Sequence, residues 1–270
     1  FLYRDNDHWH GEKEVLGRHI SAGMGIEDGR IVIGILLDHP ATPTFLATKM
    51  VRRFVTDDPL GQTPGLVGRV ADAFTRTGGD IREMVSTILR SREFAASFAS
   101  YGGRLSRPMD LVARGLRVLD AQPTDFDLDI RGRAYSNIMA ALAAMGHYPF
   151  DWVTPDGYPD VKAAWAGTSA LLTRWNLGLT LAGVGGKFGG QLLRGFQPAR
   201  QTPASLVTAG EAVDYWIERL LHRPMLPEDR GIVVGQLAGD GPESTPLASV
   251  QDRLPETIAL ILDSPYFQWR

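Results

Sequence analysis

Apolar residues recur at helical spacing along most of the 270-residue chain, and this periodicity constrains the fold more than any other feature. Between residues 81 and 89 they follow one another in steps of three and four, and Asp80 stands where a side chain caps a first turn. A second stripe runs from Tyr135 to Met145 and ends at Gly146. Further helices are expected near residues 28–38, 43–56, 64–76, 108–120, 168–183, 206–222, 227–238 and 250–263. The pattern predicts an all-α fold, a multi-helix bundle of roughly ten helices.

Strand character is confined to the start of the chain. Phe1–Arg4 and Val15–Ile20 have the composition of a small hairpin or edge ribbon. We therefore expect a β-ribbon entry over residues 1–26 and a helical domain over residues 27–146. Aromatic and glycine-rich loops with one or two helices should follow over residues 147–203, and then a C-terminal helical repeat over residues 204–270 that packs on the same core.

The helices contain an internal repeat, because Ile81–Phe94 aligns without gaps with Leu254–Phe267. The identical pairs are Glu83/Glu256, Ile88/Ile261, Leu89/Leu262, Ser91/Ser264 and Phe94/Phe267. Upstream, each copy has an arginine-bearing helix, then a proline (Pro59 or Pro224), then another helix. A duplicated helical unit predicts two copies packed as a pseudo-symmetric bundle. The alternative is a chance similarity between two amphipathic helices.

Composition excludes several classes of function. The chain has no cysteine, which excludes disulfides, thiolate catalysis and cysteine-ligated zinc. A net charge of −3 offers no basic field for a phosphate backbone, so nucleic acid is not expected as the main partner. The longest apolar runs, such as Ile31–Leu37, are too short to span a bilayer, and no membrane span is expected. A phosphate-binding Walker loop, a nucleophile elbow and a zinc-protease helix are also absent, which leaves open whether the chain is an enzyme.

Two segments lack helical periodicity, His147–Asp160 and Gly183–Pro203, and long ordered loops in compact domains are often functional. In and just after the first segment lie Tyr148, Phe150, Trp152, Tyr158, Trp165 and Trp175, together with Asp151, Asp156 and Asp160. Aromatic faces stack on sugar rings, and carboxylates bind hydroxyls or act as acid and base. The expected binding residues are Tyr148, Trp152, Asp156, Tyr158 and Trp165.

A structural interpretation of the same loop stands beside the functional one. Pro155-Asp156-Gly157 is a turn signal, because proline presets φ and glycine takes a positive φ. In this interpretation Asp156 closes an Asx turn and the aromatic side chains seal the loop against the bundle.

His8, His10 and Glu12 form a second candidate site, because alternate residues of an extended strand share one face and could converge on a divalent metal. A third or fourth ligand would come from His19, His39 or Asp38. The alternative is a pair of surface histidines on a hairpin, with Lys13 burying its stem and pairing with an acidic neighbour.

Four stretches of the sequence, taken together, carry a family resemblance. They are His8–Lys13 with Val15–Gly17; His39–Thr42 with Phe45, Lys49 and Arg53–Val55; Ser91–Phe94; and Pro149-Phe150 with Trp152, Pro155–Pro159, Trp165 and Arg174. The chain resembles the C-terminal portion of proteins in the "domain of unknown function 1800" family. Trp9 departs from that family's usual His-Asp-x-Gly-x-Lys pattern, whereas the string from Trp152 to Pro159 is the most specific match.

The resemblance implies a bacterial, usually exported helical protein, and hence a periplasmic or extracellular location, but it implies no known reaction. Family members are normally longer at the N-terminus, so an N-terminal fragment of the same protein is a candidate partner. The leading hypothesis is a noncatalytic protein that binds a polysaccharide or another cell-envelope polymer through the aromatic loop. The alternative is a hydrolase or metal-dependent enzyme that uses Asp151, Asp156 or the His8/His10 pair, with its site completed by the missing N-terminal part. No cofactor is expected beyond that divalent metal.

Overall fold

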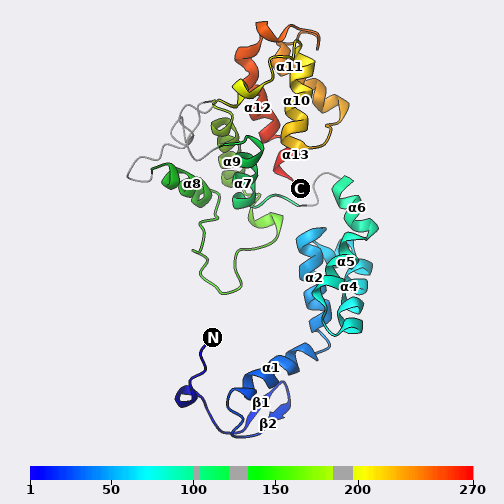
Figure 1. The fold of residues 1–270 in the computed structure, drawn as a ribbon, viewed down its shortest axis with the longest axis vertical. Helices are drawn as coiled ribbons and strands as arrows, with labels where there is room; N and C mark the ends of the chain where they lie inside the picture. The colour runs from blue at the N-terminus through cyan, green and yellow to red at the C-terminus, as the bar shows by residue number, and fades with distance from the viewer. Residues whose placement is uncertain (100–103, 122–132, 185–196, 270) are drawn as a thin grey trace. The chain divides into compact units, whose positions relative to one another are not determined.

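The computed structural model of the chain describes residues 1–99, 104–121, 133–184 and 197–269. Helices predominate throughout, and the strands of the described residues form a single two-stranded sheet, which confirms the predicted all-α fold with a minor N-terminal ribbon (Figure 1). The chain divides into two compact units, Phe1–Ser97 and Phe98–Arg270. The division falls inside the stretch 27–146 that we expected to be one helical domain.

The first unit begins with a short 3-10 helix, Asp5–Asp7, and an antiparallel ribbon of β1 (Lys13–Val15) and β2 (Arg18–Ile20). Leu16 and Gly17 join the strands and both have positive φ, 50° and 71°, as tight hairpin turns require. The segment expected to have strand character, Val15–Ile20, contains all of β2 but only the last residue of β1. The expectation of a strand at Phe1–Arg4 was wrong, because these residues lead into the 3-10 helix Asp5–Asp7 and pair with neither β1 nor β2.

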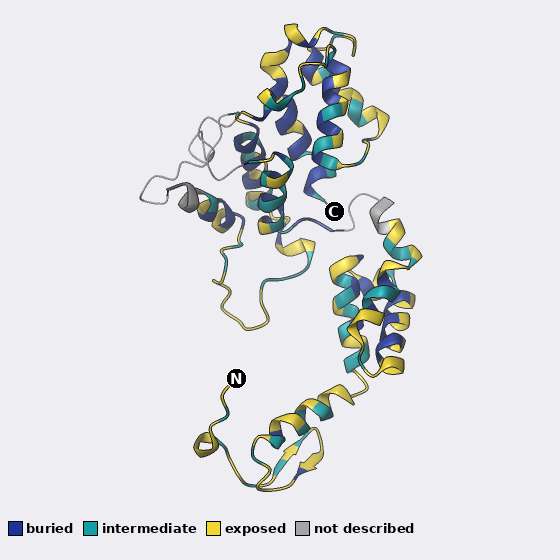
Figure 2. Ribbon diagram, in the orientation of Figure 1, coloured by how far each residue is buried: buried dark blue, intermediate teal, exposed yellow. Residues whose placement is uncertain are grey.

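Six helices follow the ribbon: α1 (Glu27–Leu37), α2 (Thr42–Phe54), α3 (Pro59–Gln62), α4 (Pro64–Thr77), α5 (Ile81–Leu89) and α6 (Arg92–Ala99). The last of them, α6, crosses the boundary between the two units. Apolar side chains of α2, α4 and α5 form the core of the first unit, and Val51, Leu66, Val70, Met84 and Ile88 are fully buried there. Figure 2 shows these helices buried on one side and exposed on the other, as their periodicity predicts.

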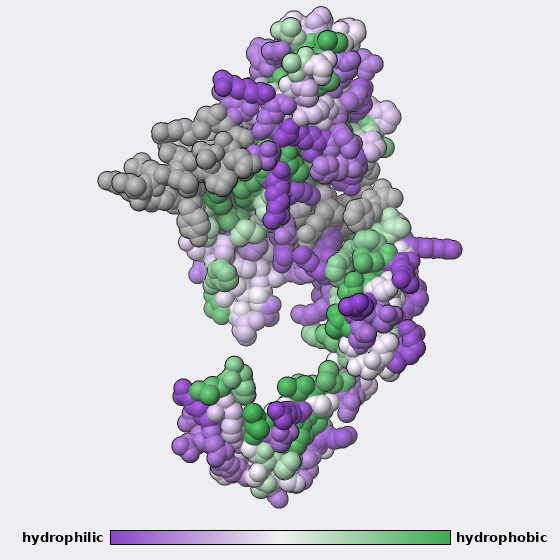
Figure 3. Space-filling model, in the orientation of Figure 1, coloured by the Kyte–Doolittle hydropathy of each residue, from purple (hydrophilic) through white to green (hydrophobic). Residues whose placement is uncertain are grey.

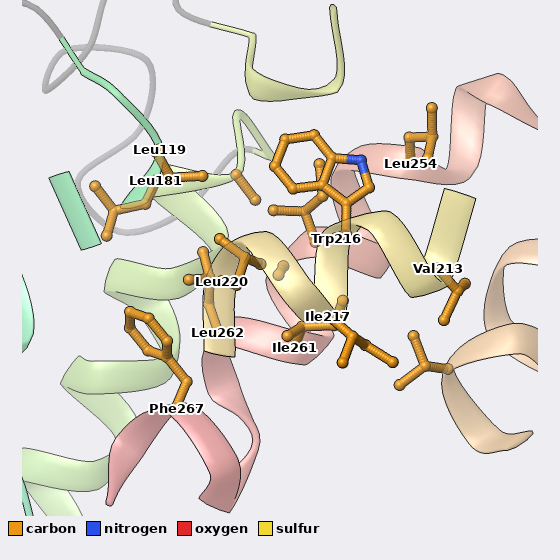
Figure 4. Close-up of a cluster of buried hydrophobic side chains, with 14 of the residues drawn as sticks. Leu119, Leu181, Val213, Trp216, Ile217, Leu220, Leu254, Ile261, Leu262 and Phe267 are labelled. Atoms are coloured by element: carbon orange, nitrogen blue, oxygen red, sulfur yellow. The ribbon is translucent and has the colours of Figure 1, made fainter. Parts of the chain in front are cut away.

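The second unit contains α7 (Pro108–Val118), α8 (Arg133–Ala144), α9 (Thr168–Leu181), α10 (Ala209–Leu221), α11 (Pro227–Ala238), α12 (Leu254–Asp263) and α13 (Pro265–Gln268). Short 3-10 helices at Lys162–Ala164, Pro198–Gln201, Leu247–Ser249 and Gln251–Arg253 connect them. Trp216, Leu220, Ile261 and Leu262 are buried members of the core of this unit (Figure 4). The Trp216 indole N–H donates to the Thr202 hydroxyl at 3.0 Å, so this buried polar atom is satisfied.

The internal repeat is visible in the order and ends of the helices. The series α2, α4, α5 and α6 corresponds to α10, α11, α12 and α13. Helices α4 and α11 stop in the same way, at Gly78 and Gly239, both with a φ of 65°. In each case the amide of the following residue donates to the carbonyl five positions earlier. Gly79 donates to Phe74 at 2.9 Å, and Asp240 donates to Gly235 at 3.0 Å.

The two copies lie in different units. Ile88 is buried in the core of the first unit, and its counterpart Ile261 is buried in the core of the second. Each copy therefore packs on its own core, and the C-terminal copy shares its core with α7, α8 and α9. No single described helix is long and apolar enough to cross a membrane, and only α1 and α2 together, bent by 75°, have the length and composition for it.

Two predicted features lie partly outside the described residues. Residues 185–196 make up most of the glycine-rich segment Gly183–Pro203, so only its ends are described. The side chain of Tyr135, the first member of the stripe in α8, is also outside the description.

Candidate functional site

The segment from His147 to Trp165, hereafter the aromatic loop, connects α8 to α9 (Figure 1). Gly146 adopts a φ of 79°, and the His147 amide donates to the Leu142 carbonyl at 2.8 Å. This glycine C-cap ends the helical path after α8 and directs the chain into the loop. The end of the helix and the start of the loop therefore follow from the sequence.

Four rings of the loop contact one another, with Tyr158 in the middle. The ring centroid of Tyr158 is 4.5 Å from that of His147, 4.8 Å from that of Trp152 and 5.9 Å from that of Trp165. The rings of His147 and Trp165 are 5.2 Å apart. The Tyr158 hydroxyl also donates to the Tyr148 carbonyl at 2.5 Å, which ties the two arms of the loop together.

The second half of the loop is anchored to the core of its unit. Trp165 is 3% exposed, and its indole N–H donates to the Pro159 carbonyl at 3.0 Å. The buried guanidinium of Arg104 donates to the Asp160 carboxylate at 2.6 Å and to the Asp160 carbonyl at 3.2 Å. Charge-assisted bonds of this kind are stronger than neutral ones, so Asp160 is held firmly.

Arg104 is itself held in place through Arg174. The fully buried guanidinium of Arg174 donates to the Ser106 carbonyl at 2.7 Å and to the Gln268 side chain at 3.3 Å. A chain of polar contacts thus runs from α9 through residues 104–106 to the aromatic loop. Arg174 is one of the residues that carry the family resemblance, and this contact is its structural role.

Asp156 organises the tip of the loop. One carboxylate oxygen accepts from the Trp152 indole N–H at 3.1 Å and from the Thr154 hydroxyl. Gly157 has a φ of 75°, as the Pro-Asp-Gly turn signal predicts. Asp156 therefore has a structural role that differs from the predicted Asx turn, because its carboxylate bonds to the side chains of Trp152 and Thr154 and orients the Trp152 ring.

Several apolar side chains of the loop face solvent. Trp152 is 41% exposed and Tyr148 is 43% exposed, while Phe150 and Val153 are almost entirely exposed. Figure 2 shows this part of the loop as a largely exposed trace between α8 and α9. Of the predicted binding residues, Trp165 is the buried anchor and the other four lie at or near the surface. Trp175, which lies on α9, takes no part in the ring contacts found among the described residues.

His147 is the member of this cluster that sequence reasoning missed. Burial and then the nearby Arg107 lower the pKa of its imidazole, while Asp110 acts in the opposite direction. Its Nδ1 accepts from the Met109 amide at 3.4 Å, which places the remaining proton on Nε2. The available signal was its position directly after Gly146, at the first residue of the loop.

The histidines near the N-terminus have different partners from those of a metal site. His8 Nε2 lies 2.6 Å from a carboxylate oxygen of Asp28, and Lys13 Nζ lies 2.8 Å from the same oxygen. Asp28 is 3% exposed, and the hydrogen bonds from Lys13 and then His8 lower its pKa. The expectation that Lys13 pairs with an acidic neighbour is met by Asp28.

His10 and Glu12 do not join that group. His10 Nε2 bonds to the Asp5 carbonyl at 3.2 Å, and Glu12 is exposed. The predicted metal site required His8, His10 and Glu12 to lie on one face of an extended strand, whereas β1 begins only at Lys13. His39 accepts the Ala41 amide at 3.2 Å, next to the start of α2. Within the described part of the chain, no three histidine, aspartate or glutamate side chains are placed to hold a metal ion.

Comparison with known proteins gives a family and no function. No curated protein and no solved structure matches the chain. The family described as "Protein of unknown function (DUF1800)" matches residues 1–269, nearly the whole sequence. The chain therefore belongs to the DUF1800 family, as the motifs around Trp152 and Pro159 indicated.

Proposed function

We propose that this protein is exported and binds an extracellular polymer, a glycan, through the aromatic loop. One observation carries the proposal. The ring of the partly exposed Trp152 is held in place, because its centroid lies 4.8 Å from that of the Tyr158 ring and its indole N–H donates to the Asp156 carboxylate. A ring held in one orientation loses little conformational entropy when a flat ligand stacks on it. Sugar rings present such apolar faces, and Trp and Tyr combine a large apolar area with a polar edge.

The loop offers more than one contact for an extended ligand. Tyr148 and Phe150 are exposed on the first arm, and Trp152 is exposed near the tip. The Asp151 carboxylate is also exposed and can accept bonds from hydroxyl groups. Separate apolar platforms with a polar acceptor between them suit a polymer better than a single small molecule.

The arrangement supports binding better than hydrolysis. Glycoside hydrolysis needs two carboxylates on either side of the scissile bond. Asp160 is ion-paired with Arg104, and Asp156 accepts bonds from Trp152 and Thr154. Two of the three loop carboxylates thus maintain the shape of the loop, which makes a noncatalytic role the better-supported one.

A polysaccharide screen with matched tryptophan variants tests the proposal. Purified protein is incubated with a panel of bacterial envelope and plant polysaccharides, and any ligand found is titrated by calorimetry. Trp152→Ala should weaken binding by roughly tenfold or more, because a stacking face is lost. Trp175→Ala is the control, since that side chain is 47% exposed and lies outside the ring cluster.

Circular dichroism must show that both variants remain folded. If no polysaccharide in the panel binds, or if Trp152→Ala binds as well as Trp175→Ala, the aromatic loop is not a glycan site.

A further inference from the structure

Exposed apolar side chains are concentrated at the start of the chain. Twelve of the 25 large apolar side chains that are exposed among the described residues lie within the first 60 residues. Figure 3 shows hydrophobic side chains gathered over α1 and the segments next to it. Concentrations of this kind mark surfaces that bind another protein or a membrane.

Helix α1 exposes an apolar face of its own. Ile33, Leu36 and Leu37, at positions i, i+3 and i+4, are 59%, 48% and 52% exposed. Residues at this spacing lie on one side of a helix, and the helix contacts β2. A surface helix of a soluble domain ordinarily carries polar residues on its solvent side, whereas this side of α1 is apolar.

Helix α2 exposes a groove that is both apolar and cationic. The groove has a volume of about 550 Å³ and is lined by Ala41, Thr44, Phe45, Thr48, Lys49, Arg52 and Leu60. Phe45 and Leu60 are each 58% exposed, and Lys49 Nζ lies 5.2 Å from the centroid of the Phe45 ring. No acidic residue lines it.

The charge of α2 indicates what covers this groove. The helix carries Lys49, Arg52 and Arg53 and no acidic residue. No ion pair of these three cations is found among the described residues, and the Arg52 Nε–H donates to the Asp57 carbonyl at 3.4 Å. The apolar stripe of α2 packs on the core, so its exposed side combines these cations with Phe45. On an anionic lipid surface such cations bind lipid phosphates, and the apolar side chains beside them enter the acyl boundary.

We propose that the first unit docks on an anionic lipid surface through the outer face of α2 and the exposed face of α1. The contact lies on the membrane and does not cross it. Phe45, Leu36 and Leu37 enter the apolar boundary, and Lys49 and Arg52 bind the headgroup phosphates. The residues of this surface belong to the first unit and are different from those of the aromatic loop in the second.

Vesicle flotation with the full chain tests the electrostatic part. The protein should float with vesicles of equal parts phosphatidylglycerol and phosphatidylcholine, far less with pure phosphatidylcholine, and less in 0.5 M NaCl. The double variant Lys49→Gln/Arg52→Gln should bind the anionic vesicles about 30-fold more weakly. The control Arg82→Gln/Arg90→Gln removes two positive charges at exposed positions, one in α5 and one directly after it. This control should bind the vesicles like the unmodified protein.

A second pair of variants tests the apolar part. Leu36→Ser/Leu37→Ser should weaken vesicle binding, whereas Ile81→Ser/Leu89→Ser, at similarly exposed positions of α5, should not. Equal flotation with both vesicle types, or equal binding by all four variants, overturns the proposal. A concentration-dependent dimer in sedimentation that is lost on Leu36→Ser/Leu37→Ser, without vesicle binding, would assign the face to a second copy of the chain instead.

Discussion

Asp263, the last residue of α12, shows how burial alone determines the ionisation of one side chain. Its Oδ1 is shielded from solvent and has no hydrogen-bond donor among the described residues. Burial raises the pKa of this carboxyl to about 8. The folded protein therefore holds Asp263 largely protonated at neutral pH, because an unpaired carboxylate is costly in an apolar environment.

The raised pKa of Asp263 makes the stability of the fold depend on pH. In the unfolded chain Asp263 ionises near its ordinary pKa of 3.8, whereas in the folded chain it ionises near 8. Between these values the folded state binds one proton more than the unfolded state, so stability falls as pH rises and levels off above about pH 8. Asp263→Asn removes this dependence.

We expect Asp263→Asn to raise the free energy of unfolding at pH 8 by about 2–4 kcal/mol, and to change it little near pH 4. Urea unfolding followed by circular dichroism at pH 4, 6 and 8 measures the difference. Asp252→Asn, an exposed aspartate of the same unit, is the control. A variant whose stability falls with pH as steeply as that of the unmodified protein would contradict this account.

Arg174 is the basic counterpart of Asp263 in the same unit. Burial lowers its pKa to about 10, so the guanidinium still carries its charge at neutral pH. Its guanidinium donates hydrogen bonds to two neutral oxygens, the Ser106 carbonyl and the Gln268 side-chain oxygen. Their role is positional, because together they connect α9 to the segment that carries Arg104.

At the scale of elements, the close approach of α9 and α12 depends on a glycine. A Cβ placed on Gly178 of α9 would lie 1.9 Å from Oδ1 of Asp263 and 2.8 Å from its carboxyl carbon. Real atoms cannot approach so closely, so either the carboxylate or α12 would have to move. Gly68, in the interior of α4, has open space around the same position.

Alanine at these two glycines should have opposite effects. Gly178→Ala should lower the free energy of unfolding by about 1–3 kcal/mol through overpacking. Gly68→Ala should raise it by about 0.5–1 kcal/mol, because alanine favours a helix over glycine when nothing obstructs its methyl group. Thermal and urea unfolding of both variants measure the changes. If Gly178→Ala proves as stable as the unmodified protein, the contact between α9 and α12 is looser than the structure shows.

At the scale of the whole molecule, the described residues form two hydrophobic cores that share no residue. Ile88 and Ile261 are equivalent positions of the internal repeat, and each is fully buried in its own core. Separate cores predict two cooperative unfolding transitions, each governed by its own packing.

The two isoleucines provide a matched test of this independence. Ile88→Ala should lower the free energy of unfolding of the first unit by roughly 2–5 kcal/mol. Ile261→Ala should lower that of the second unit by a similar amount, and the Tm of each affected unit should fall accordingly. Differential scanning calorimetry should show that the other transition stays in place. A single transition that shifts in both variants would mean that the units unfold together.

The sequence by itself determined the helices, because the signals that define a helix are local. Periodicity, caps and glycine stops lie within a few residues of one another, and α4, α5, α9 and α11 begin and end close to the predicted positions. The aromatic loop and its Pro-Asp-Gly turn were predictable for the same reason. The string from Trp152 to Pro159 also indicated the family.

Only the tertiary structure decided which distant residues meet. Arg104 reaches Asp160 across 56 positions of the chain, and His8 reaches Asp28 across 20, with nothing in the local sequence to indicate either pairing. The metal hypothesis failed to find support for this reason, since it assumed a strand where the chain instead turns toward Asp28. The division into two units was hidden as well, because periodicity shows that a face is buried but not which core buries it.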